Sequence, residues 1–386
     1  MFPADWAIVN IIQTIGINAQ KTVTNVHTMW GKHCNEKWIV IKFQVRSMNC
    51  KFDRTIGNMM ITKQTSACFR GIAILMVVAS HYAEWMIEAT TYPVVREFLC
   101  GFGVLGVDIF FLVSGYGLAK SADAKGVGRN FLWNRLKTCY LPYLLVAGVM
   151  MFLEGGFQDG GDVKDYFLGS DYWYISVQMV LYLCFFICYA PETLLSEKWK
   201  GVWNKIKDLL LVVLVVGFTY GLYTMGRADF WIVSNGAFLI GVYLTRLENG
   251  QRHEKTRQLM RSIPYLLIVC LAVLAFSHFC FNRTLLMRWE MIKSMAFTLS
   301  VAGIGLLHDF KCVPLSVLGR YSLYLYLTHG FIYRCVGAWL PGKTHMVILS
   351  VWLILTLVVG LLVGLFIEWL MERVPSWGSK HLLRND

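Results

Sequence analysis

A series of long apolar runs is the feature that most constrains how this chain folds. The runs hold roughly 17 to 25 residues each, the length at which an α-helix crosses the hydrocarbon core of a bilayer. Apolar residues make up 56% of the chain, well above the average of soluble domains. The sequence therefore predicts an all-α fold, a polytopic membrane bundle of about ten transmembrane helices, at residues 71–88, 98–118, 139–153, 172–190, 208–224, 230–246, 263–281, 292–308, 316–333 and 346–370.

Lysine and arginine are distributed unevenly between the two sets of alternating loops. One set, together with the C-terminal tail, holds 17 of them, whereas the opposite set holds 7. Cytoplasmic loops carry the excess of basic residues, so both termini are expected in the cytoplasm. The net charge of +12 then reflects topology. Because the basic residues are dispersed over separate loops, no nucleic-acid partner is expected.

The cysteines give no sign of a metal centre. Eleven of them are scattered through the chain, mostly within the apolar runs, and none forms a C-x-x-C pair. Neither a metal site nor a disulfide framework is therefore predicted. We expect the cysteines to be reduced and packed as small apolar residues.

The chain divides into three segments of different composition. Residues 1–65 form a polar, basic tail without a full-length span. This tail either lies on the membrane surface as an amphipathic segment or reflects a later translation start, at Met48, Met59 or Met60. Residues 66–372 have short loops and no linker, and are expected to form one membrane domain. Residues 373–386 are expected to form a short cytoplasmic tail.

Arg70 and His81 stand on the first predicted span, in the stretch RGIAILMVVASH. Their spacing is about three helical turns, so they share one face, with His81 about 16 Å deeper in the membrane. Ionisable side chains are costly in lipid and mark functional sites there. Glu84 follows His81 by three residues, where a carboxylate raises the basicity of the imidazole, as a general base requires. A structural His81 that only hydrogen-bonds a neighbouring helix is the alternative.

The second span carries the segment GVDIFFLVSGYGL, with Asp108 near mid-membrane. A lone carboxylate at this depth needs a partner, and we expect it to pair with His81 or Arg70 on the neighbouring span. Ser114 follows nearer the cytoplasm, next to a glycine that permits close helix approach. A structural aspartate in a broken helix is the alternative.

Basic residues also stand at the cytoplasmic entry of the third span, in RLKTCYLPY. Arg135 and Lys137 are placed to meet phosphate groups, and Pro142 is expected to kink or reset the helix just inside the membrane. Taken alone, the two cations are better explained as anchors that follow the positive-inside rule.

Aromatic residues and a second histidine mark the outer half of the predicted membrane region. The segment DYWYISVQMVLYL opens the fourth span with Trp173 and Tyr174, which suit either an interfacial belt or the ring of a sugar acceptor. The segment GRYSLYLYLTHGF places His329 in the ninth span, either as a packed histidine or as a catalytic one.

Taken in order, these segments resemble acyltransferase family 3, a family of integral membrane acyltransferases that modify surface carbohydrates and other acceptors. The resemblance runs from about residue 66 to residue 372. Its landmarks are R-x10-H at Arg70 and His81, GVDIFF followed by SG, the basic entry that ends at Pro142, WYISVQMVLYL, and YSLYLYLTH. Thr138 stands where many relatives carry the second arginine of an R-x-x-R pattern.

The resemblance implies an acyl-CoA co-substrate, acetyl-CoA in the first place, that enters from the cytoplasm, with no bound cofactor. His81 would act either as a general base on an acceptor hydroxyl or as a transient acyl carrier. Three groups of residues follow from this assignment: His81, Asp108 and Glu84 for catalysis, Arg70, Arg135, Lys137 and Ser114 for the acyl-CoA, and Trp173, Tyr174 and His329 for the acceptor.

The expected activity is O-acylation of a cell-surface carbohydrate or its lipid-linked precursor in the bacterial cytoplasmic membrane. Two other interpretations fit the same spans and buried ionisable groups. One is a transporter or exporter of polysaccharide or lipid-linked intermediates, which would not need acyl-CoA. The other is an interaction or sensor protein with a degenerate core. The acceptor, the acyl chain length and the oligomeric state stay open at this point.

Overall fold

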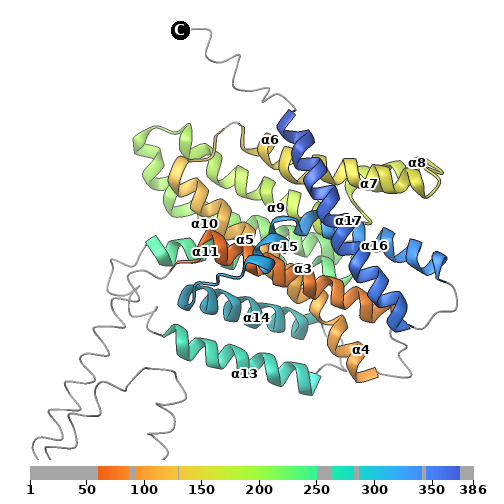
Figure 1. Ribbon diagram of the computed structural model, residues 1–386. Coiled ribbons are helices and arrows are strands. Elements are labelled where there is room, and N and C mark those ends of the chain that lie inside the picture. Colours follow the sequence, from red (N-terminus) through yellow and green to blue (C-terminus); the bar gives the residue numbers. More distant parts are fainter. Residues whose placement is uncertain are drawn as a thin grey trace, which may run out of the picture. The chain divides into compact units, whose positions relative to one another are not determined.

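The computed structural model describes residues 60–86, 93–128, 130–249, 262–281, 287–340 and 345–373. All of these residues belong to one unit of the chain, Asn58–Asp386. Within the described ranges the chain forms helices and no strand, and Figure 1 shows these helices packed as a bundle. The predicted all-α polytopic fold is confirmed.

A helix lies at each of the predicted spans. Eight segments of the described chain are long and apolar enough to cross a membrane. They fall in α3 (Lys63–Met86), α4 (Pro93–Cys100) with α5 (Phe102–Lys125), α6 (Phe131–Arg135) with η1 (Leu136–Tyr140) and α7 (Leu141–Leu153), α9 (Trp173–Tyr189), α10 (Glu197–Thr224), the region of α11 (Asn235–Asn249), α14 (Met287–Leu307), and α17 (His345–Arg373).

The other two predicted spans are helical as well. They correspond to α13 (Ile263–Phe281) and α16 (Ser322–Trp339). Polar side chains lower the hydropathy of α16, among them Thr328 and His329, and both of these are buried. The short helix α8 (Gly160–Leu168) follows α7 and precedes α9.

α5 lies at the centre of the bundle, where α3, α11 and α14 pack against it. Two glycines allow backbones to approach closely. A Cβ at Gly115 would lie 2.2 Å from the carbonyl oxygen of Phe238 on α11. A Cβ at Gly319 would lie 1.8 Å from the carbonyl oxygen of Ala67 on α3. Any other side chain would push the helices apart at these positions, so the two glycines fix how the helices around the site are placed.

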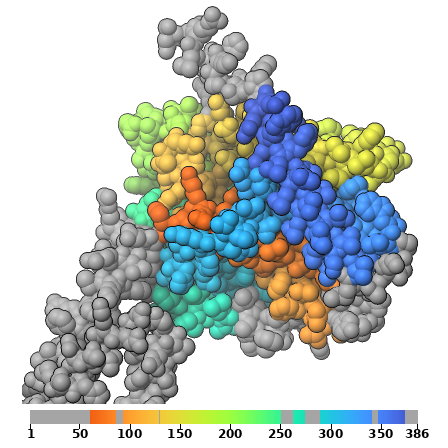
Figure 2. All heavy atoms as spheres, viewed as in Figure 1, coloured from red at the N-terminus to blue at the C-terminus, as the bar shows by residue number. Residues whose placement is uncertain are grey.

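The ninth predicted span is broken into two helices. α15 (Val313–Arg320) ends just before Tyr321, whose backbone leaves helical geometry (φ −99°, ψ 11°), and α16 begins at Ser322. The predicted single run of 316–333 is wrong in this respect. α15 stays packed against α3 through Gly319, whereas α16 packs mainly against α17. Figure 2 shows the spheres of α15 lying against those of α3.

The third predicted span begins earlier than residue 139, because α6, η1 and α7 form one continuous helical segment. The reset predicted at Pro142 takes the form of the π-helical turn η1 (Leu136–Tyr140) immediately before it. Proline has no N–H to donate to the preceding turn. A π-helical turn accommodates this interruption without ending the helix, and such turns are frequent at functional sites.

Contacts with the helix bundle extend a few residues before residue 66, where the membrane domain is predicted to begin. The Ile61 side chain is buried, and its N–H donates to Glu248 on α11 (3.3 Å). The Thr62 and Thr65 hydroxyls donate to Asp309 (2.7 and 2.9 Å), and these bonds hold the pKa of that carboxyl below its usual range. Residues 1–59 and 374–386, with the start-site and tail predictions, lie outside the described residues.

Candidate active site

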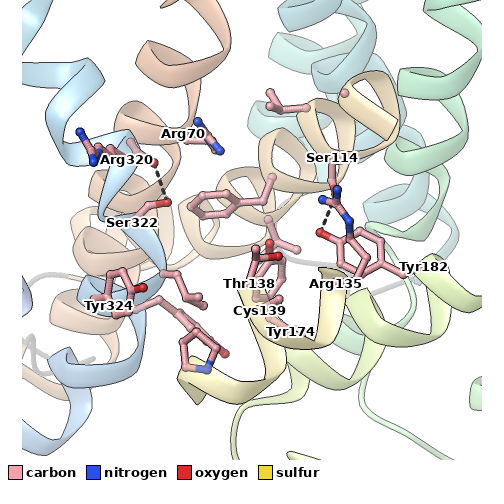
Figure 3. A pocket seen from close by; sticks show the side chains of 18 of the residues that line it. Arg70, Ser114, Arg135, Thr138, Cys139, Tyr174, Tyr182, Arg320, Ser322 and Tyr324 are labelled. Atoms are coloured by element: carbon pink, nitrogen blue, oxygen red, sulfur yellow. Dashed lines mark hydrogen bonds between the residues drawn. The ribbon is translucent and has the colours of Figure 1, made fainter. Parts of the chain in front are cut away.

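A cavity of about 610 Å³ opens between α3, α5, the η1 turn, α9, α15, α16 and α17. This volume is typical of sites that bind small molecules or cofactors. The four residues predicted to hold an acyl-CoA line it together, although they come from three separate segments: Arg70, Ser114, Arg135 and Lys137. Figure 3 shows Arg70 and Arg320 on one side of the cavity and Ser114, Arg135 and Tyr182 on the other.

Arg70 and Arg135 reach the cavity without a protein counter-ion. The Nε atom of each is buried and has no hydrogen-bond partner in the part of the chain that the structure describes. Among the described residues, no carboxylate lies within ion-pairing distance of either guanidinium. The Arg135 guanidinium instead lies over the rings of Phe131 (5.5 Å) and Tyr182 (5.7 Å). A buried cation without a partner is costly, so the two arginines are suited to an anionic ligand.

The η1 turn supplies one wall of the cavity. Lys137, Thr138 and Cys139 all lie on this turn and line the cavity, together with Pro142. The Thr138 hydroxyl donates to the carbonyl oxygen of Asn134 (2.7 Å), one turn earlier. The residue that replaces the second arginine of the R-x-x-R pattern therefore still faces the cavity, but without a charge.

The break between α15 and α16 supplies the opposite wall, which the sequence analysis missed. Arg320 and Ser322 stand on either side of the break and line the cavity. Arg320 is bound to Glu368 of α17, with Nε donating to Oε1 (3.1 Å) and Nη2 to Oε2 (2.9 Å). The signal in the sequence is the Gly-Arg-x-Ser order of GRYS.

Two histidines meet beyond the end of the cavity. The ring of His81 on α3 lies 4.9 Å from the ring of His329 on α16 and 4.9 Å from the ring of Trp85. Nδ1 of His81 is 3.2 Å from a carboxylate oxygen of Glu84, the residue predicted to orient it. This contact favours a proton on Nδ1 and leaves Nε2 free to accept one. His329 is held by the indole of Trp352, whose N–H donates to its carbonyl oxygen (2.9 Å).

The chain matches the acyltransferase domain model of acyltransferase family 3 over residues 67–373, which is most of its length. The chain belongs to acyltransferase family 3. No curated protein and no solved structure gives a significant match. The protein is therefore a membrane acyltransferase, and its multi-pass architecture agrees with the apolar helices of the described chain.

Asp108 of this family 3 acyltransferase is not paired as predicted. Its carboxyl is fully buried and accepts a hydrogen bond from Ser294 of α14 (2.7 Å), and its second oxygen has no hydrogen-bond partner among the described residues. The expected pairing with His81 or Arg70 is wrong, because Asp108 lies on the side of α5 that packs against α14. Of the two carboxylates considered for orienting His81, the structure brings only Glu84 to it.

The two aromatic residues predicted on the acceptor side of the acyltransferase lie apart. Trp173 packs on Phe230 (5.3 Å) and Trp231 (6.2 Å), as expected of an interfacial belt residue. Tyr174 points the other way and lines the cavity. Its neighbour on the opposite wall, Tyr326, was not singled out from the sequence and lies 5.5 Å from it, measured between ring centroids.

Proposed function

We propose that this protein is an O-acyltransferase that moves an acetyl group from cytoplasmic acetyl-CoA to a hydroxyl of a cell-surface carbohydrate or its lipid-linked precursor. The observation that carries the proposal is a cavity lined by two partly buried arginines that have no counter-ion among the described residues, with a histidine pair next to its lining residue Tyr326. The proposed location is the bacterial cytoplasmic membrane.

The cavity supplies the features that a CoA ester requires. Arg70, Arg135 and Lys137 would bind its phosphates, since arginine is suited to bidentate phosphate recognition and lysine to a point-charge contact. The apolar inner lining, which includes Val77, Val107 and Phe110, would accept the uncharged pantetheine arm and its thioester.

The histidine pair supplies the chemistry. Nε2 of His81 would take the proton of the acceptor hydroxyl while the oxygen attacks the thioester carbonyl carbon. The new C–O bond replaces the C–S bond, and the proton on His81 passes to the departing CoA thiolate. Glu84 would hold the imidazole and stabilise its charged form through Nδ1. His329, which packs against His81, would position the ring.

The acceptor would approach His81 from the side opposite to the cavity. The His81 side chain is 31% exposed and the Glu84 side chain 56% exposed, whereas neither lines the donor cavity. Both residues lie near the end of α3 that is predicted to face outward. A carbohydrate hydroxyl could thus reach the imidazole without passing the bound CoA.

The proposal is tested with membranes that contain the full chain, supplied with radiolabelled acetyl-CoA and native surface glycans. Wild type should transfer label to a polysaccharide or lipid fraction. His81→Ala should abolish the transfer while the protein still inserts and folds. Lys198→Ala, at an exposed position on α10, is the matched control and should leave the rate unchanged.

Equal labelling by wild type and His81→Ala would reject the role of His81. Export of unmodified glycan that does not depend on acyl-CoA would instead support the transporter interpretation.

A further inference from the structure

The inner end of the donor cavity is closed by two tyrosines from different helices. Tyr174 of α9 and Tyr326 of α16 both line the cavity, and their rings meet edge to face at 5.5 Å and 74°. Each ring is supported from behind. Phe111, which is fully buried, stacks on Tyr174 at 5.4 Å, and Tyr172 packs edge-on against Tyr326 at 6.0 Å.

One of the two rings, that of Tyr326, lies next to the histidine pair. The ring of Tyr326 is 5.7 Å from that of His329, which in turn is 4.9 Å from the ring of His81. Tyr326 thus presents one side to the cavity and another to the histidines. His81 is absent from the lining of the cavity, although Val77, one helical turn earlier on α3, is part of it. Tyr326, against which Tyr174 packs, therefore connects the lining of the donor cavity to the histidine pair.

We propose that Tyr174 and Tyr326 form an aromatic barrier that restricts the donor to short acyl groups. The inference rests on the proposed function, because it concerns the acyl end of the same donor. A short acyl group needs only a small displacement of the rings to bring its carbonyl carbon to the histidines. A longer chain has to occupy the volume that the two rings fill. The barrier also separates the two sides of the site when no acyl group is present.

The rings, and not their hydroxyls, carry this selectivity. The Tyr174 hydroxyl donates to Gln178 on its own helix (3.2 Å), away from the contact with Tyr326. Phenylalanine at either position keeps the ring and its packing, whereas alanine removes both and leaves space, because close-packed surroundings collapse only partly. The two kinds of variant therefore separate the volume of the ring from its polar group.

The experiment compares transfer from acetyl-CoA and octanoyl-CoA by the full chain in membranes. Tyr174→Ala and Tyr326→Ala should raise the ratio of octanoyl to acetyl transfer by about tenfold or more, as expected when a hydrophobic pocket gains room for several methylenes. Tyr174→Phe and Tyr326→Phe should keep the wild-type ratio. Tyr182→Ala, which removes a ring from the same cavity near Arg135, should lower the overall rate and leave the ratio unchanged.

Folding of each variant is checked by its melting temperature in detergent and by binding of CoA alone, which lacks an acyl group. An unchanged ratio in both alanine variants that still bind CoA would overturn the barrier while leaving the proposed function intact. Failure of the wild type to transfer either acyl group would overturn the proposed function, and the barrier with it.

Discussion

Arginines occur in two opposite settings on the predicted cytoplasmic side of this acyltransferase. Arg246 of α11 is fully engaged: Nη1 donates to Asp123 (2.7 Å), Nε to Asp208 (3.1 Å) and Nη2 to the Tyr189 hydroxyl (3.0 Å). It ties α11 to α5, α10 and α9. Arg70 has no such partners within the described ranges and faces a cavity.

The presence or absence of protein acceptors around the guanidinium distinguishes a structural arginine from one that is available to a ligand. Both arginines are partly buried and both lie near the ends of central helices. The Arg246 guanidinium has acceptors from the protein itself, so the folded protein neutralises its charge. Arg70 and Arg135 have no such acceptors among the described residues, and under the proposed function a ligand would supply the neutralising charge. Removing a paired arginine such as Arg246 should lower stability, whereas removing an unpaired one such as Arg70 should lower activity.

The largest effect is expected for Arg70→Ala. Loss of charge-assisted hydrogen bonds to a phosphate should lower kcat/KM for acetyl-CoA by about 100-fold, because each such bond contributes about 1.5–3 kcal/mol. The melting temperature without ligand should be unchanged or slightly raised, since an unpaired buried cation is removed. Transfer assays and thermal unfolding of the same preparation measure both. A large loss of stability with normal kcat/KM would reverse the distinction between the two arginines.

Arg246→Ala should show the opposite pattern. Removal of the guanidinium leaves Asp123 and Asp208 without their partner, which should cost about 1–3 kcal/mol of unfolding free energy. The folded fraction should keep the wild-type kcat/KM. Arg246→Lys retains the charge but not the planar fork and should give an intermediate melting temperature. If Arg246→Ala lost activity without losing stability, the network would have a role in the reaction.

Alkylation of Cys139 offers a direct view of the cavity. This thiol lines the cavity next to Lys137 and Thr138. Acetyl-CoA, which has no free thiol to react with maleimide, should slow maleimide labelling by about tenfold at about ten times its Kd, in proportion to the unoccupied fraction. Cys139→Ala gives the background from the other cysteines, and Arg135→Ala should remove the protection at the same concentration of acetyl-CoA. Equal labelling with and without acetyl-CoA in the wild type would place the donor elsewhere.

The sequence predicted correctly those features of the structure that depend on a single helix. Apolar run length predicted the helices, and the spacing of Arg70 and His81 placed them correctly on one helix, with Glu84 beside the imidazole. The residues predicted to hold the donor, among them Ser114 and Arg135, share one cavity. The family resemblance was the reason for grouping these residues, because the sequence of three separate segments does not by itself determine the distance between them.

Contacts between helices were out of reach of the sequence. The partner of Asp108 depends on which side of α5 packs against α14, and a lone carboxylate in a span does not reveal that. The break at Tyr321 stands next to Gly319, which packs against α3. The apolar run continues through this position in the sequence, so neither the break nor the role of Arg320 was predicted. Tyr326 gains its place beside Tyr174 only through the packing of α16 against other helices.

The smallest effect is expected at Arg320. This arginine lines the cavity, as Arg70 does, but it is also paired within the protein, with Glu368. The pair is partly exposed, at 65% for Arg320 and 32% for Glu368, so it contributes little. Glu368→Gln should free the guanidinium for the donor and tighten CoA binding by about two- to fivefold at low salt, the range set by exposed ion pairs. Equilibrium binding of CoA measures the change, with Glu372→Gln on the same helix as the control. Weaker binding of CoA by Glu368→Gln would mean that the Glu368 carboxylate orients Arg320 toward the ligand. Arg320 would then contribute to CoA binding, as Arg70 and Arg135 are proposed to do, only while this carboxylate is present.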